Sequence, residues 1–250
     1  MRERTSKRRP PGPGRGAPAP GLERIAHAVI ACDRCPRLRR YCQEIAATKR
    51  RAFRDWTYWG RPVPGFGDPR ARLWIVGLAP AAHGANRTGR MFTGDSSGDW
   101  LYRALHDAGF AAHPTSESLD DGQQLRDVYI SAVARCAPPD NKPTPNEIAR
   151  CAPYLAQEHA ALSHLRVILP LGSIAFDAVL RLVVASGAVV PRPRVRFAHL
   201  ARYDLLSGNS PHTVLASYHP SRQNTQTGRL TRPMFDAVFR AAREFLAEGP

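Results

Sequence analysis

The sequence lacks any apolar run approaching the roughly 18 residues that a helix needs to cross a bilayer, and its N-terminus lacks the apolar segment of a secretion signal. We therefore expect a cytoplasmic protein. Acidic residues are also scarce, with 21 Asp and Glu against 36 Lys and Arg, which gives a net charge of +15. This excess favours a polyanionic partner such as nucleic acid or an acidic membrane surface, although an arginine-rich chain from a GC-rich genome can be equally basic.

Sequence repeats of fixed period are absent, because the 23 Pro and 19 Gly are scattered, and this excludes collagen and solenoids. Residues 1–20 hold six Lys or Arg, one acid, five Pro and three Gly, with almost nothing that could pack in a core. We predict a disordered basic tail there. The tail contributes +5 of the total +15, so residues 21–250 are also basic, and the hydrophobic content of 43% suits a single domain.

Four short apolar runs predict buried strands, at 72–79, 128–134, 166–172 and 213–219. Their nearly continuous hydrophobic character is typical of parallel strands covered on both faces. Helical patterns flank them at 22–51, 97–109, 145–165, 174–184 and 234–248, and residues 194–206 suit a hairpin or a long loop. We predict an α/β fold with three layers, α/β/α, around a central, mostly parallel four-stranded sheet.

Five cysteines are present, and in a reducing compartment they indicate metal ligation, chemistry or burial rather than disulfides. Cys32 and Cys35 form a C-x2-C pair, and Cys136 and Cys151 follow about 100 positions later. Four thiolates of this kind bind either zinc or an iron-sulfur cluster, although isolated buried thiols are an alternative. Cys42 lies about two helical turns beyond Cys35, so we expect a core thiol outside the site.

Two polar loops follow predicted strands, at the edge where ligands of parallel sheets bind. The first runs from Gly77 to Asp95, and its glycines allow the backbone to approach a ligand closely. Asp95 can cap the next helix, whose free amides favour an anionic group, and Phe92 is either a stacking platform for a base or a core anchor. In the second loop, His219 can donate a hydrogen bond to a leaving group, although a His before Pro is often structural.

Taken together, these motifs resemble the uracil-DNA glycosylases of the iron-sulfur branch, and more closely the family-five (type B) members. The likeness spans residues 22–248. It is carried by Gly77-Leu-Ala-Pro80 with Asn86-Arg-Thr-Gly-Arg90, by His219-Pro-Ser221 and by the cysteine spacing.

The resemblance implies a structural 4Fe-4S cluster on Cys32, Cys35, Cys136 and Cys151. It also implies that Phe92 stacks on an extruded base and that His219 hydrogen-bonds a uracil carbonyl oxygen. The residues expected to contact the base or the DNA are Gly77, Ala79, Pro80, His83, Gly84, Phe92, Ala132, Ser221 and Asn224.

The sequence departs from the wider superfamily at two positions. Leu78 and Ala79 stand where most uracil-DNA glycosylases carry an acidic or amide side chain that orients the attacking water. The nearest polar candidates are Asn86, Asp95 and Asn141, of which we expect Asn86 and Asn141 to act. Ala132 replaces an Asn that reads the base edge in uracil-specific relatives. Without that hydrogen-bonding side chain, discrimination between bases is weaker. We therefore predict activity on uracil and on other deaminated or altered bases, including hypoxanthine.

The sequence therefore predicts a monofunctional DNA repair enzyme that hydrolyses the N-glycosidic bond of a flipped-out base and leaves an abasic site. We expect a cytoplasmic, nucleoid-associated monomer with no membrane partner. The main alternative is a metal-stabilised nucleic-acid-binding module without catalysis, against which the polar loops argue. A relative that becomes covalently attached to DNA is a third option, but no basic insertion precedes His219.

Overall fold

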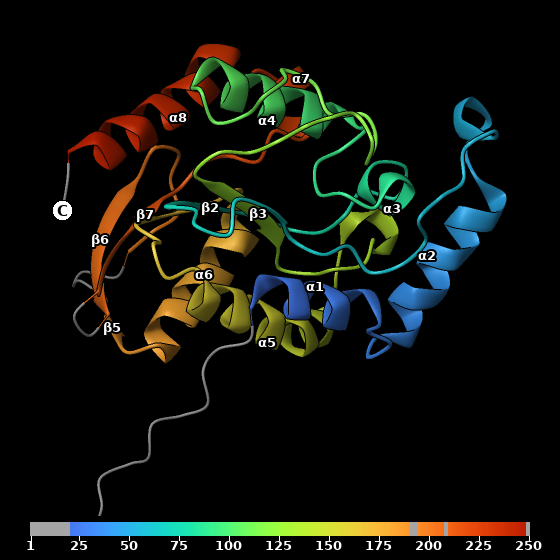
Figure 1. The fold of residues 1–250 in the computed structure, drawn as a ribbon, viewed down its shortest axis with the longest axis horizontal. Coiled ribbons are helices and arrows are strands. Elements are labelled where there is room, and N and C mark those ends of the chain that lie inside the picture. Colours follow the sequence, from blue (N-terminus) through green and yellow to red (C-terminus); the bar gives the residue numbers. More distant parts are fainter. Residues whose placement is uncertain (1–20, 191–194, 208–209, 249–250) are drawn as a thin grey trace, which may run out of the picture.

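A single seven-stranded sheet runs through the protein in the order β1-β3-β2-β4-β7-β6-β5 (Figure 1). The computed structural model describes residues 21–190, 195–207 and 210–248. The tail predicted for residues 1–20 lies outside the described residues.

The centre of the sheet is parallel and consists of the four strands expected from the apolar runs. They are β3 (Val128–Ala132), β2 (Leu73–Gly77), β4 (Val167–Pro170) and β7 (Ser210–Leu215), paired in that order. In the register, Gly77 lies opposite Ala132 and Val76 lies opposite Pro170. The prediction of an α/β fold with a mostly parallel sheet is confirmed.

The number of strands was predicted wrongly, because three antiparallel strands extend the sheet at its edges. β1 (Phe66–Gly67) pairs with β3, β6 (Arg202–Ser207) pairs with β7, and β5 (Ala188–Val189) pairs with β6. β1 and β5 have two residues each, and β6 mixes polar with apolar residues. None of the three therefore contains a continuous apolar run of the kind that marks a central strand.

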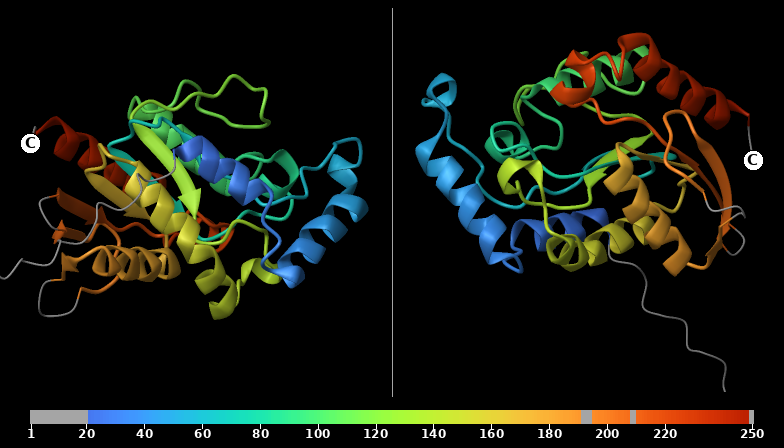
Figure 2. Two further views of the ribbon diagram at one scale, coloured as in Figure 1. Left: turned by 60° about the horizontal axis from the view of Figure 1, so that its bottom comes forward. Right: turned by 180° about the vertical axis from the view of Figure 1, so that it is seen from behind.

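Helices cover both faces of the sheet (Figures 1 and 2). α4 (Ser96–Asp107) and α8 (Arg232–Ala247) pack on the face that carries Leu73 and Ile75. α5 (Pro145–Ala161) and α6 (Ser173–Ala185) pack on the opposite face, which carries Trp74 and Val76, and α1 (Leu22–Ile30) lies against α5. Among the described residues, no helix is both long and apolar enough to pass through a membrane.

The helical pattern at 22–51 forms two helices rather than one. α1 ends at Ile30, and α2 (Pro36–Thr48) begins at a proline, whose fixed φ and missing N–H suit the first turn of a helix. Cys32 and Cys35 lie in the turn between these two helices.

A buried ion pair joins the end of β3 to α5. The guanidinium of Arg135 contacts the carboxylate of Glu158, and both side chains are about 1% exposed. Nε and Nη1 of Arg135 have no hydrogen-bond partner within the described part of the chain. Glu158 is therefore the carboxylate that compensates this buried charge.

Candidate active site at the carboxyl edge of the sheet

The rings of Phe92 and His219 lie side by side beyond the carboxyl ends of β2 and β7. Their centroids are 5.8 Å apart and their planes are inclined by 31°. Both side chains are half-buried. The two loops singled out in the sequence thus bring an aromatic face and an imidazole to one place.

Phe92 takes an unusual backbone conformation, with φ at +54°, in a region that bulky residues rarely adopt. Its ring packs directly over Gly77. A Cβ on Gly77 would lie 2.8 Å from both Cε2 and Cζ of Phe92. The space that a side chain at Gly77 would need is therefore filled by the Phe92 ring.

Asp95 caps α4, as the sequence predicted. Its Oδ1 accepts hydrogen bonds from the backbone N–H groups of Ser97 at 2.9 Å and Gly98 at 3.0 Å. Its Oδ2 lies against Gly84, where a Cβ would overlap it. These helix amides, expected to favour an anionic ligand, thus bind the protein's own carboxylate. Burial is the largest cause that raises the pKa of Asp95.

His219 is held by its neighbours on the last loop. Nδ2 of Asn224 donates to the backbone oxygen of His219 at 2.8 Å, and Ser221 caps α7 (Arg222–Gln226) through the amide of Asn224. A Cβ on Gly172, which follows β4, would lie 3.4 Å from Cβ of His219. Burial lowers the pKa of His219 to about 4, so its imidazole is neutral near neutral pH.

The loop from Gly77 to Asp95, called the base-binding loop after its expected role, is also braced by Phe53, Trp56 and Tyr58, which the sequence interpretation missed. The guanidinium of Arg87 is buried between the rings of Phe53 and Trp56, at 4.0 Å from each centroid. Nε of Arg87 donates to the carbonyl of His83 at 2.8 Å, and Nδ1 of His83 contacts the Tyr58 hydroxyl at 3.0 Å. The concentration of aromatic residues at 53–59 was the available signal.

The two asparagines expected to orient water occupy different environments. Asn86 is fully buried on α3 (Ala85–Thr88), and its Nδ2 donates to the carbonyls of Cys42 and Ala82, both at 3.3 Å. Among the described residues, its Oδ1 has no hydrogen-bond partner. Asn141 is exposed at the end of the short 3-10 helix η2 (Pro139–Asn141), with φ at +56°. Asn86 is therefore also a structural link between α3 and α2.

Small residues line the ends of β2 and β3. Ala132 is 1% exposed and lies opposite Gly77 in the sheet. Pro80 is buried and Ala79 is half-buried. Neither strand end places a polar side chain on this stretch of the edge.

The four predicted cysteine ligands come from separate parts of the fold. Cys32 and Cys35 lie between α1 and α2, Cys136 follows β3, and Cys151 lies on α5. Cys35, Cys136 and Cys151 are each 6% exposed. In the described ranges, no three or more His, Cys, Asp or Glu side chains form a ready-made site for a metal ion.

The thiols are nevertheless close enough to affect one another. Burial is the main cause that raises the pKa of Cys35, and Cys136 and Cys32 raise it further. Burial likewise raises the pKa of Cys151 to about 11, with contributions from Cys136 and Cys35. A set of soft donors gathered from distant segments suits an iron-sulfur cluster in its chemistry. Cys42 is fully buried and points its Sγ at the carbonyl of Ala137, at 3.6 Å.

Comparison with known proteins identifies the family of this chain. Residues 64–243 match the family described as the Uracil DNA glycosylase superfamily. A type-5 uracil-DNA glycosylase of Mycobacterium tuberculosis is 51% identical over 217 residues, which cover 86% of this chain and 78% of that protein. One of Thermus thermophilus is 49% identical over 221 residues, covering 88% and 96%. A type-4 uracil-DNA glycosylase of Pyrobaculum aerophilum is 32% identical over 164 residues, covering 65% and 66%. Within the uracil-DNA glycosylase superfamily, the chain belongs to the type-5 family.

Proposed function

We propose that this protein excises uracil from DNA by hydrolysing the N-glycosidic bond, which leaves an abasic site. The observation that carries the proposal is the contact between Phe92 and His219, with ring centroids 5.8 Å apart at the carboxyl edge of the sheet. Relatives named type-5 uracil-DNA glycosylase, at about half identity over most of the chain, support it. We further expect a monomer that acts at the nucleoid, where its substrate lies.

In the proposed reaction, the extruded base stacks on the face of Phe92 while His219 binds its edge. As the bond from the sugar to the base breaks, negative charge develops on the base. A positioned N–H donor stabilises such charge and is typically worth about a hundredfold to a thousandfold in rate. Because its pKa is lowered to about 4, His219 donates as a neutral imidazole. Asn224 acts as a positioning residue, since it holds the His219 backbone.

We propose that Asn86, together with Asn141, orients the attacking water. Two carbonyls fix Nδ2 of Asn86, so its Oδ1 is the acceptor that stays available for an O–H group of the water. An amide is too weak a base to take the proton, which passes to solvent once water has added to the sugar. Departure of the stabilised base therefore carries most of the lowering of the barrier.

We propose that Cys32, Cys35, Cys136 and Cys151 hold a 4Fe-4S cluster. Burial, together with neighbouring thiols, raises the pKa of Cys35 and of Cys151, and iron stabilises such cysteines by binding them as thiolates. When bound, the cluster supplies a structural cross-link between the α1–α2 turn, the end of β3 and α5. Analysis of iron and sulfide in the purified protein tests this, and zinc in place of iron would contradict it.

We also propose a broad substrate range. Ala132 presents only a methyl group at the end of β3, and it is buried opposite Gly77. Without a hydrogen-bond reader at this position, bases other than uracil, such as hypoxanthine, meet no unsatisfied polar partner.

The test of function uses a labelled duplex with one uracil, followed by alkali, which cleaves abasic sites. The wild-type protein should produce cleavable sites. His219→Ala should reduce their rate of formation by about a hundredfold or more while the affinity for DNA changes little. Binding of the duplex without any abasic product would instead support a non-catalytic nucleic-acid-binding module.

A further inference from the structure

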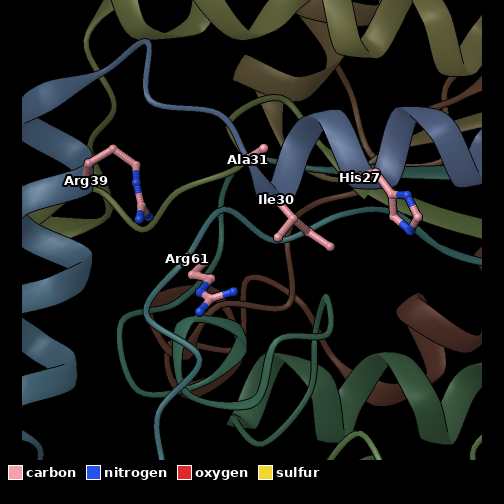
Figure 3. A pocket seen from close by; sticks show the side chains of 5 residues that line it. All are labelled: His27, Ile30, Ala31, Arg39 and Arg61. Carbon is pink, nitrogen blue, oxygen red and sulfur yellow. The ribbon is translucent and has the colours of Figure 1, made fainter.

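A pocket of about 410 Å³ lies between α1, α2 and the segment after Trp59 (Figure 3). Its lining consists of His27, Ile30, Ala31, Arg39 and Arg61. Two arginine side chains thus border a space whose lining contains no carboxylate. None of the ion pairs in the described part of the chain involves Arg39 or Arg61.

Both arginines are held in position by neighbouring groups. Nη1 of Arg39 donates to the carbonyl of Gly60 at 3.2 Å, and its side chain also contacts Cys136. The guanidinium of Arg61 lies 5.9 Å from the centre of the Trp59 ring. Among the described residues neither guanidinium forms an ion pair with a carboxylate, and this favours an anionic ligand.

The wall of this pocket is connected to the base-binding loop. The amide of Gly60 donates to the carbonyl of Asn86 at 3.0 Å, and the amide of Trp59 donates to the carbonyl of Arg87 at 2.9 Å. Asn86 and Arg87 belong to α3, a few residues before Phe92. The segment that carries Arg61 is therefore fixed by backbone hydrogen bonds to the short helix that precedes Phe92.

We propose that the Arg39–Arg61 pocket binds a phosphate group of the DNA backbone next to the extruded nucleotide. This inference rests on the proposed function, since it takes DNA as the substrate. Guanidinium groups match phosphate oxygens with paired hydrogen bonds. The pocket positions the DNA and carries no sequence information, as is usual for phosphate contacts.

The first test compares Arg61→Gln with Arg181→Gln, a control in the second half of α6, away from the base-binding loop. Both residues are exposed, so neither change should disturb the core. Affinity is measured by fluorescence anisotropy on a duplex with a stable abasic-site analogue, over a range of salt. We expect Arg61→Gln to bind about tenfold more weakly, and its slope of log affinity against log salt to be shallower by about 0.9, the value for one lost phosphate contact. Arg181→Gln should match the wild type.

The second test removes the ligand charge instead. Single methylphosphonate groups replace the phosphates on either side of the abasic analogue, one at a time. At one position the replacement should weaken binding by the wild type and leave Arg61→Gln unaffected. Arg39→Lys, which keeps the charge, should lose the paired geometry and weaken binding at that same position, with unchanged iron content as its folding check.

Equal affinity and salt slope for Arg61→Gln and the wild type would overturn the proposal. So would a pattern in which every methylphosphonate weakens both proteins alike. Neither outcome depends on catalysis, because the abasic analogue is not cleaved. If the wild-type protein binds this duplex but forms no abasic sites in uracil-containing DNA, the proposed function is contradicted. The proposal of a phosphate site is not contradicted by that result.

Discussion

Replacing Gly77 with alanine tests whether the Phe92 ring must sit where it does. Gly77 has an ordinary strand conformation, so an added methyl group causes no backbone strain of its own. It would lie 2.8 Å from Cε2 and Cζ of Phe92, whereas carbon atoms normally approach to about 3.5–4.0 Å. The ring must therefore withdraw by about 1 Å, and a displacement of that size in a reacting geometry costs about a hundredfold in rate.

We expect Gly77→Ala to excise uracil about a hundredfold more slowly under single-turnover conditions, and to lose about 1–3 kcal/mol of unfolding free energy through overpacking. The control is the same substitution in a Phe92→Ala background. Without that ring, the next atom that the methyl group approaches is the carbonyl oxygen of Ser131 at 3.7 Å, an ordinary contact, so the rate should change less than about threefold. An equal penalty in both backgrounds would refute the reasoning, as would a wild-type rate for Gly77→Ala.

Four further predictions concern charge, specificity and stability. Because the pKa of His219 is lowered to about 4, we expect the single-turnover rate to be flat between about pH 5.5 and 8, and a step near 6.5 would show that the imidazolium is required. Protonation of His219 is more favourable in the unfolded chain than in the folded one, so acid should destabilise the wild type through this residue. As the pH falls from 6.5 to 4, the free energy of unfolding should decrease by up to about 3 kcal/mol more in the wild type than in His219→Gln. Ala132→Asn should lower the rate on hypoxanthine relative to uracil by about tenfold or more, measured on matched duplexes. Undiminished excision of hypoxanthine would contradict the proposal that Ala132 broadens the substrate range. Glu158→Gln leaves the buried Arg135 charge without its carboxylate and should reduce the free energy of unfolding by about 3 kcal/mol in urea titrations, whereas a loss below about 1 kcal/mol would show that Arg135 has another compensating partner.

The parallel centre of the fold could be predicted because β2, β3 and β4 are buried throughout and therefore read as unbroken apolar runs. The edge strands could not, since β1 and β5 contain two residues each and their pairing depends on neighbours far along the chain. At these edges, tertiary context decides the structure and local composition does not.

The candidate site was predictable to the extent that strand ends determine it. Phe92 follows β2 and His219 follows β7, and only β4 lies between these two strands, so both loops leave the same edge of a parallel sheet and can meet. What fills the space beside Gly77 and Gly84 could not be predicted, because a glycine shows that room is needed without showing for which atoms. The position of Arg87 between Phe53 and Trp56 is likewise set by packing between segments that no local pattern connects.

The loop from Gly77 to Asp95 is packed against the protein's own side chains, with Phe92 over Gly77 and Asp95 over Gly84. Such a surface is already ordered before any lesion arrives, and an incoming nucleotide need not supply the free energy for arranging it. The loop should therefore bind the nucleotide without changing its conformation. Crystal structures determined with and without a DNA duplex should superimpose over this loop.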